Sequence, residues 1–416
     1  METIMPRWSE YTTGERIKIL RGKTIRQSDL AEMTGLSLPT VQQVEQDKRL
    51  TLPTLMALAA ALRVDTSVIL GQQEPRRAME HGDRTMMRNL SVAVHDTAVG
   101  LLPANVVPPS SDELRQTIAR SWDLYWKGRY VEAGGIASLL LAEARAHLHA
   151  QPADAQAEAW SYLCDAYRLS AYVANLVGSR DLAYAAIGHA QQAAERTADD
   201  MRGPLVASGR AWIYLRDARL DEALALAEKS AVDIEPRFST ATMGQLVAYG
   251  SHVNFAAVVA SRMGNKDRAT DYLSQSHATG ARMGAEHRAH GTLFGPVSAT
   301  TQAVGVNVAL GQTGKALTLI KAIKDVSTLS EAAQNRYAMD KAMAQADARQ
   351  WDASLDTLES ALVAAPDWAR HQALPSVIVQ KVGRASTARL RRVSKLIGAV
   401  PPGADGFMPA TTRTAL

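Results

Sequence analysis

The chain has 416 residues, too many for one ordinary core, so two or three domains are expected. Hydrophobic residues make up 46% and charged residues 21%, which excludes a disordered chain. The net charge of +4 is too small to indicate nucleic acid binding by itself. The single cysteine, Cys164, excludes an intrachain disulfide. No signal peptide and no apolar run of roughly 20 residues is visible, so we expect a cytoplasmic protein without membrane contact.

Alanine and leucine are abundant and alternating β-branched stretches are absent, which predicts an all-α fold class. Residues 12–70 have the pattern of five short helices. Between the second and the third, Gly35 can adopt a left-handed turn and Ser37 can cap the next helix, with Pro39 in its first turn. Ala31 is small enough for that helix to cross close by. We therefore expect a helix-turn-helix whose second helix presents an outer face that fits the major groove of DNA.

The segment Glu15–Leu70 resembles the lambda-repressor/Cro-like helix-turn-helix family, often called the XRE family. The matching features are Arg16-Ile-Lys-Ile-Leu-Arg21, Gln27, Leu30-Ala31, Gly35 and Glu45. The resemblance implies sequence-specific binding to double-stranded operator DNA, and a structural ion pair between Arg21 and Glu45. Family members often carry polar readers where this chain has Leu38-Pro39. DNA shape and apolar contacts would therefore supply part of the readout.

The resemblance also implies the residues that touch DNA. Gln27 would contact a phosphate from a helix N-terminus, and Gln43 could bond bidentately to adenine, whereas Gln42 points further from the groove. Lys48 and Arg49 would hold the DNA backbone. Gln43 could instead be solvated surface, and the two cations could be loop charges. The implied set is Arg26, Gln27, Ser37, Leu38, Pro39, Thr40, Gln43, Lys48 and Arg49.

The composition divides the chain into four parts. We expect a helix-turn-helix domain at 1–73, a linker at 74–111, a helical repeat domain at 112–400 and a flexible tail at 401–416. The linker is rich in proline and serine and has one modest apolar stretch, Met86–Val94, which predicts a short helix.

Six stretches of the long region share one register, in which a small residue ends a helix and an alanine follows near the start of the next. They are Gly128–Ala133, Gly178–Ala183, Ala218–Ala223, Gly264–Ala269, Gly311–Ala316 and Ala348–Ala353. The small residue permits a left-handed backbone, and the alanine lets two antiparallel helices approach closely. The stretches resemble tetratricopeptide (TPR) repeats, although the spacing is longer than the usual unit of about 34 residues. We expect a TPR-like α-solenoid.

The first helices of these hairpins would line a concave surface. Positions three, six, ten and thirteen before each small turn residue form one stripe, which Trp122 and Tyr125 begin. Its candidate ligand-binding residues are Arg168, Tyr172, Asn175, Trp212, Ser251, Asn254, Ser298, Thr301 and Asn335. The layout is similar to that of peptide-sensing RRNPP-type and actinobacterial regulators, which implies a peptide or small-molecule effector. Alternatively, the stripe is wet polar surface or is covered by the linker, or some repeats form a homodimer interface.

The end of the chain is basic. From position 370 on, a single acid, Asp405, accompanies the cations Arg370, Lys381, Arg384, Arg389, Arg391, Arg392, Lys395 and Arg413. Either a solvated terminal helix docks on an acidic neighbour, or the cations make a supplementary phosphate contact.

No pattern indicates catalysis. Gly311-Gln-Thr-Gly-Lys315 lacks the spacing of a phosphate loop and falls between helices. His287 and His290, expected near a helix start, lack further metal ligands nearby. We expect no enzyme, cofactor or metal site. The sequence favours a dimeric transcriptional regulator, and the alternative is an interaction adaptor that uses the helix-turn-helix and the repeats for partner binding.

Overall fold

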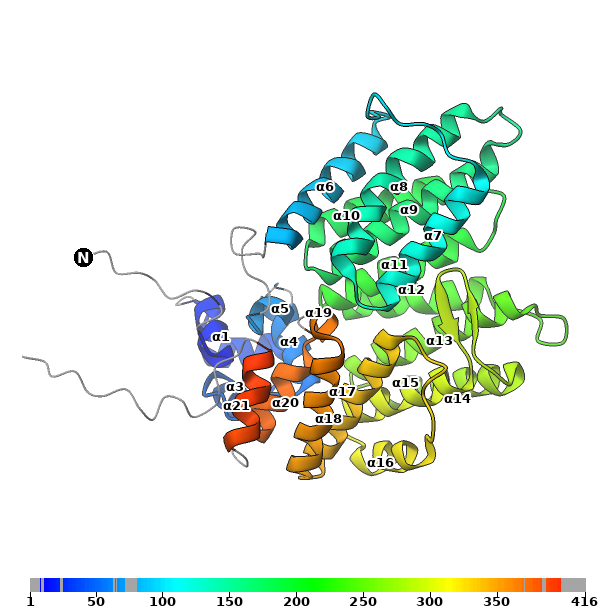
Figure 1. The fold of residues 1–416 in the computed structure, drawn as a ribbon. Helices are drawn as coiled ribbons and strands as arrows, with labels where there is room; N and C mark the ends of the chain where they lie inside the picture. Colours follow the sequence, from blue (N-terminus) through cyan, green and yellow to red (C-terminus); the bar gives the residue numbers. More distant parts are fainter. Residues whose placement is uncertain are drawn as a thin grey trace, which may run out of the picture.

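The computed structural model describes residues 8, 11–22, 25–62, 64, 66–71, 81–369, 371–383 and 387–397. Apart from one small hairpin, the regular secondary structure of these residues is helical, so the all-α fold class is confirmed (Figure 1). The N-terminal unit, called the head here, consists of α1 (Thr13–Arg21), α2 (Gln27–Thr34), α3 (Leu38–Glu45), α4 (Leu52–Leu62) and α5 (Thr66–Ile69). The expected tail at 401–416 lies outside the described residues.

The turn between α2 and α3 has the expected local chemistry. Gly35 ends α2 in a left-handed conformation, with a φ of 66°. The Ser37 hydroxyl accepts a hydrogen bond from the backbone N–H of Thr40, which caps α3, and Pro39 lies in the first turn. Both the turn and the cap that the sequence predicts are therefore confirmed.

The orientation of α3 is fixed by the buried carboxylate of Glu45, which is 1% exposed. Its Oε1 accepts a hydrogen bond from Arg21 Nε of α1 at 2.7 Å, and its Oε2 accepts one from Gln27 Nε2 of α2 at 2.6 Å. Gly14 of α1 lies so close that a Cβ atom there would be 2.5 Å from the Glu45 carbonyl oxygen. One side chain thus joins three helices, and the predicted ion pair of Arg21 with Glu45 is confirmed.

The helical domain, residues 81–397, begins within the expected linker. The short helix expected at Met86–Val94 is the longer α6 (His81–Ala98), and it packs against α8. Met86, Met87 and Leu90 are buried there, because α6 has an apolar face that α8 covers. The helices that follow are α7 (Ser111–Trp126), α8 (Tyr130–Ala150), α9 (Gln156–Leu176), α10 (Arg180–Ala194), α11 (Arg202–Arg216), α12 (Leu220–Asp233), α13 (Met243–Arg262) and α14 (Lys266–Met283).

After α14 comes an antiparallel β-hairpin of β1 (His287–Ala289) and β2 (Thr292–Phe294), in which Arg288 pairs with Leu293. The chain continues as α15 (Pro296–Ala309), α16 (Thr313–Ala322), α17 (Glu331–Asp347), α18 (Trp351–Ala364), α19 (Pro366–Ala369), α20 (Leu374–Val382) and α21 (Thr387–Leu396). None of the described helices is long and apolar enough to cross a membrane.

The predicted repeat register holds for five of the six hairpins. Their turn residues all have a positive φ: Gly128, Gly178, Ala218, Gly264 and Gly311. The alanines that follow are fully buried: Ala133, Ala183, Ala223, Ala269 and Ala316. The sixth hairpin is shifted by one residue, because Arg349 rather than Ala348 has the positive φ, of 61°. Consequently Ser354 rather than Ala353 is buried against the first helix, where its hydroxyl donates to Ala342 O.

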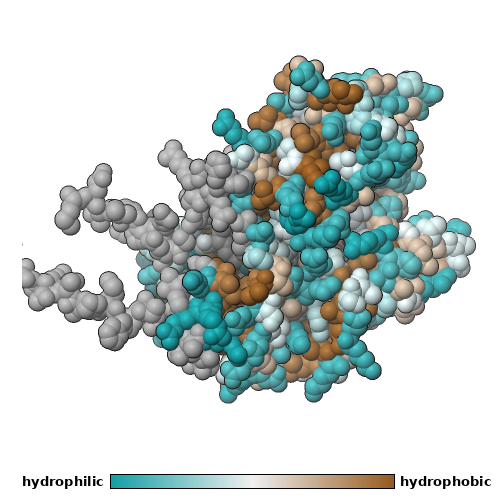
Figure 2. Space-filling view, viewed as in Figure 1, coloured by the Kyte–Doolittle hydropathy of each residue, from teal (hydrophilic) through white to brown (hydrophobic). Residues whose placement is uncertain are grey.

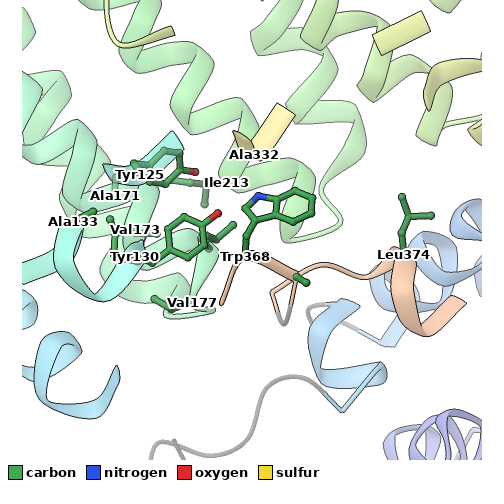
Figure 3. Packing of buried hydrophobic residues seen from close by; sticks show 14 of the residues in the cluster. Tyr125, Tyr130, Ala133, Ala171, Val173, Val177, Ile213, Ala332, Trp368 and Leu374 are labelled. Atoms are coloured by element: carbon green, nitrogen blue, oxygen red, sulfur yellow. The ribbon is translucent and has the colours of Figure 1, made fainter. Parts of the chain in front are cut away.

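Each hairpin packs on the next, and the first helices α7, α9, α11, α13, α15 and α17 also contact one another in that order. The series returns on itself, since α17 contacts α7 as well. At this closure Trp368 of α19 lies against Gly128, where a Cβ atom would be 2.8 Å from Trp368 Cβ. Figure 3 shows Trp368 between Tyr130 and Leu374, with Ala332 of α17 nearby. The first helices therefore form a closed series; we call the face along them the interior.

The β-hairpin contradicts the expectation of continuous helix after residue 112, and it crosses to the first two helical hairpins. Trp126 Nε1 of α7 donates to Gly291 O at 2.7 Å, and Arg168 of α9 donates to His290 O. Phe294 is buried against Gly250 of α13. His287 and His290, which we expected near a helix start, belong to this hairpin. The segment is held by contacts distant in sequence, so local periodicity could not predict it.

The basic end of the chain docks on acidic side chains of α18. Arg389 of α21 pairs with Asp356 at 2.8 Å, and Arg392 pairs with Glu359 at 3.1 Å. Lys381 of α20 pairs with Asp347 of α17. The docked arrangement is thus confirmed for these cations, whereas Arg370, Arg384 and Arg413 lie outside the described residues. In Figure 2 this region forms a strongly hydrophilic area at the lower left, where α21 lies in Figure 1.

Replacing Glu45 by alanine should open the head locally. The change leaves the Arg21 guanidinium without its carboxylate and Gln27 without its acceptor, which costs about 3 kcal/mol. We expect amides of α1 and α3 to exchange hydrogen about 100-fold faster, as mass spectrometry can measure. Glu32→Ala, on the exposed side of α2, is the matched control. Equal protection in the two variants would contradict the role given to Glu45.

Two glycine variants distinguish the energetic contribution of the closure from the cost of backbone strain in a turn. Gly128 and Gly264 both have a positive φ, but only at Gly128 would a Cβ atom meet another side chain. Gly264→Ala should cost about 1 kcal/mol through backbone strain, and Gly128→Ala about 1–3 kcal/mol more because Trp368 must move. Thermal denaturation of both variants measures the difference. A closure without energetic consequence would give the two variants the same melting temperature.

Candidate nucleic-acid interface and interior site

The outer face of α3 is open to solvent. Leu38 is 39% exposed, and Pro39 and Gln43 are exposed as well, while Thr40 and Gln42 are half-buried. Val41 and Val44, on the opposite side, are buried against the rest of the head. The candidate base-reading residues therefore share the free face of a helix whose other face is fixed.

The candidate phosphate contacts lie on either side of this face. Arg26 is exposed just before α2, and Lys48 and Arg49 are exposed just after α3. Gln27 donates one amide hydrogen to Glu45, and its primary amide keeps a second N–H. Gln27 could therefore hold a phosphate oxygen while it is itself held in place by Glu45.

The two hydroxyls at the start of α3 are already engaged. Ser37 Oγ and Thr40 Oγ1 lie 2.8 Å apart and share a hydrogen bond. Ser37 Oγ also accepts from the Thr40 backbone N–H, so its main role is to cap α3. The Thr40 methyl group keeps its capacity for an apolar contact with a thymine methyl group.

The interior stripe begins in an aromatic cluster beneath the β-hairpin. The rings of Trp122 and Tyr172 are 5.2 Å apart, and Tyr172 lies 4.9 Å from Trp212. The Arg168 guanidinium lies 5.0 Å from the Trp122 ring. A Cβ atom on Gly291 of the hairpin would touch Trp122 at 2.9 Å. The hairpin therefore covers the first part of the predicted ligand-binding stripe.

Other stripe residues bond to neighbouring parts of the chain. Ser251 and Thr301 donate to carbonyl oxygens of their own helices. Asn254 accepts from Ser276 of α14, and Ser298 donates to Glu286 before the hairpin. Asn335 is half-buried on α17. These hydroxyl and amide groups thus serve helix and hairpin contacts in the structure.

Asn175 differs from the other stripe residues. It is fully buried on α9, and neither polar atom of its side chain has a hydrogen-bond partner among the described residues. Such an amide is costly, since a buried polar group normally finds a partner. The unpartnered amide of Asn175 therefore lowers the stability of the fold.

The interior also holds charged residues that the stripe missed. Arg216 ends α11 and Arg262 ends α13, each two positions before the turn residue of its hairpin. Arg336 of α17 lies within electrostatic range of both. The stripe was built from positions three, six, ten and thirteen before each turn residue, and it left out position two. On a helix with 3.6 residues per turn, position two points only about 20° away from position thirteen, so it belongs to the same face. The repeated arginine at this position was the missed signal.

The head is similar to a known family of domains. Residues 17–71 match the family model of the Cro/C1-type HTH DNA-binding domain. No curated protein and no solved structure gives a match to the chain. The match covers α2 to α5 and most of α1, and it therefore includes the open face of α3. It supports a DNA-binding regulator built on a Cro/C1-type helix-turn-helix domain.

Proposed function

We propose that the protein is a sequence-specific transcriptional regulator whose operator binding is modulated through its helical domain, by homodimerisation or by an effector. The observation that carries the proposal is the exposed outer face of α3 within a Cro/C1-type domain. The roles proposed for Gln43 in base readout, and for Gln27, Lys48 and Arg49 in phosphate contact, follow the positions of these residues on and beside that face.

Dimerisation is proposed because one short recognition helix reads only a half-site, and two heads bind an operator far better than one. The helical domain has exposed apolar side chains that a second copy could cover. Val92 of α6 is 53% exposed and Leu139 of α8 is 66% exposed. Figure 2 shows apolar surface in the upper part of the view, where α6 and α8 lie in Figure 1.

Modulation needs a physical connection between the two units. Helix α4 of the head contacts α13 of the helical domain. Leu55 of α4 and Val377 of α20 also belong to one continuous cluster of buried apolar residues. A change in the packing of α13 would therefore act on α4, which packs on α2, the neighbour of α3. The resemblance to RRNPP-type regulators is part of this proposal and rests on the same layout.

The first test concerns base readout. Gln43→Ala should lower affinity for DNA from the gene's own upstream region about 10- to 100-fold, because a bidentate contact to adenine is lost. Gln42→Ala, one position along the same helix, should change affinity less than about twofold. Fluorescence anisotropy with labelled duplexes measures both. Absence of binding at any salt concentration, or equal effects of the two changes, would favour the adaptor alternative.

The second test concerns phosphate contact. Arg49→Ala should weaken binding to specific and unrelated duplexes alike, because phosphates carry no sequence information. The slope of log affinity against log salt concentration should become shallower by about one. Arg268→Ala on α14, also an exposed arginine, is the control and should leave the slope unchanged. A slope that stays constant in Arg49→Ala would show that this residue lies outside the interface.

A further inference from the structure

Three arginines lie in the interior on different helices, and one of them is an electrostatic neighbour of the other two. Arg216 of α11 and Arg262 of α13 each have Arg336 of α17 as an electrostatic neighbour. We call Arg216, Arg262 and Arg336 the arginine cluster. They are far apart in sequence, and α17 approaches the other first helices through its contacts with α15 and α7. Like charges so placed repel, so the cluster is unfavourable unless negative charge is nearby.

One carboxylate accompanies these three cations. Asp340 is 2% exposed and lies 3.4 Å from Arg336 Nε. Among the described residues, neither Arg216 nor Arg262 forms an ion pair or a side-chain hydrogen bond, and Arg216 Nε is buried without a partner. Arg262 is only 8% exposed, and burial lowers its pKa to about 9. The cluster therefore holds an excess of positive charge, which is buried at Arg262, whereas the Arg336 side chain is 34% exposed.

Two phenol groups add further hydrogen-bond donors. Tyr125 and Tyr130 are both electrostatic neighbours of Arg216, and their rings are buried with centroids 5.5 Å apart. Neither hydroxyl makes a hydrogen bond to any residue that the structure describes. Figure 3 shows Tyr130 beside Trp368 at the closure, with Tyr125 above Tyr130 in the view. Donors from α7, α8 and α17 therefore surround Arg216 of α11, and Arg336 links them to Arg262 of α13.

We propose that the arginine cluster, with the hydroxyls of Tyr125 and Tyr130, binds the oxyanion group of an organic effector. A carboxylate or a phosphate would accept hydrogen bonds from guanidinium and phenol groups and would neutralise the excess charge. This inference names the class of ligand that the effector site of the proposed regulator would bind. It therefore rests on the proposed function. Replacing such arginines by apolar residues would favour stability, so their placement points to a use other than folding.

The body of the ligand packs on aromatic side chains. The Trp212 ring lies 6.0 Å from the Arg216 guanidinium and is half-buried, and the Tyr172 ring packs against it at a tilt. An aromatic or apolar group attached to the anion would lie on this surface while the anion reaches Arg216. Because α13 carries Arg262 and contacts α4, the bound anion would act on a helix that supports the head.

The test uses the full chain and small probes, without DNA. Phenyl phosphate and benzoate should raise the melting temperature by about 2 °C or more, and the tighter binder in calorimetry distinguishes phosphate from carboxylate. Benzyl alcohol, which has the ring without the charge, and sodium chloride at equal ionic strength should not. Stabilisation no greater than that by chloride would overturn the proposal.

Variants assign the effect to the cluster. Arg216→Gln and Arg262→Gln should each weaken probe binding about tenfold or more, and should leave the melting temperature without probe unchanged or higher. Tyr125→Phe removes only a hydroxyl without a partner among the described residues, so it keeps the fold and still weakens binding. Arg268→Gln, paired with Glu228 on the surface, should bind the probes normally. Equal binding by all four variants would overturn the site.

Probe binding and operator binding, measured separately, distinguish this inference from the proposed function as a regulator. Probe binding by a protein that binds no operator DNA would support the anion site and contradict the regulator. Operator binding by a protein that binds neither probe would contradict only the anion site. Where both occur, saturating probe should change operator affinity in the normal protein and leave it unchanged in Arg216→Gln, since coupling between two ligands is reciprocal.

Discussion

The contact of Trp368 with Gly128 is the constraint on which the helical domain depends. A stack of helical hairpins normally leaves its concave face open to solvent. Here the glycine allows an indole to lie directly on the turn after α7, so the last hairpins can return to the first. Residues along the first helices consequently lose much of their water. Aromatic rings gain from this burial, whereas each charged group must find a partner or raise the free energy of the fold.

The head follows a different logic, because one buried ionic connection orients its recognition helix on an apolar core. Glu45 takes hydrogen bonds from α1 and α2, which leaves α3 with one fixed and one free face. The head has few helices of its own, but its apolar core continues into the helical domain through the cluster that contains Leu55. The two units are therefore not independent in energy. Whatever changes the packing of α13 changes the support of α4.

Local chemistry made much of this predictable. The turn at Gly35, the cap at Ser37 and the buried alanines after the helical turns depend on neighbouring residues, and the sequence displays them directly. The sixth hairpin was misplaced by one residue because Arg349 adopts a left-handed backbone that small residues usually take. The β-hairpin and the closure depend on contacts between distant segments, which no periodicity encodes. The same closure brings Arg216 and Arg336 together, so the cluster could be seen only in three dimensions.

The unpaired polar atoms complete the argument about the interior. Buried groups without partners are few in native proteins, and each calls for a physical reason. In this chain, Asn175, Arg168 and Arg216 have such atoms on α9 and α11, two of the first helices of the closed series. Apolar residues of similar size would pack there at lower cost, as they do on the buried sides of α8 and α10. These polar groups lower the stability of the fold, and they lie in a domain whose helix α13 contacts the head. Folding alone does not require such groups, whereas recognition of a polar ligand does.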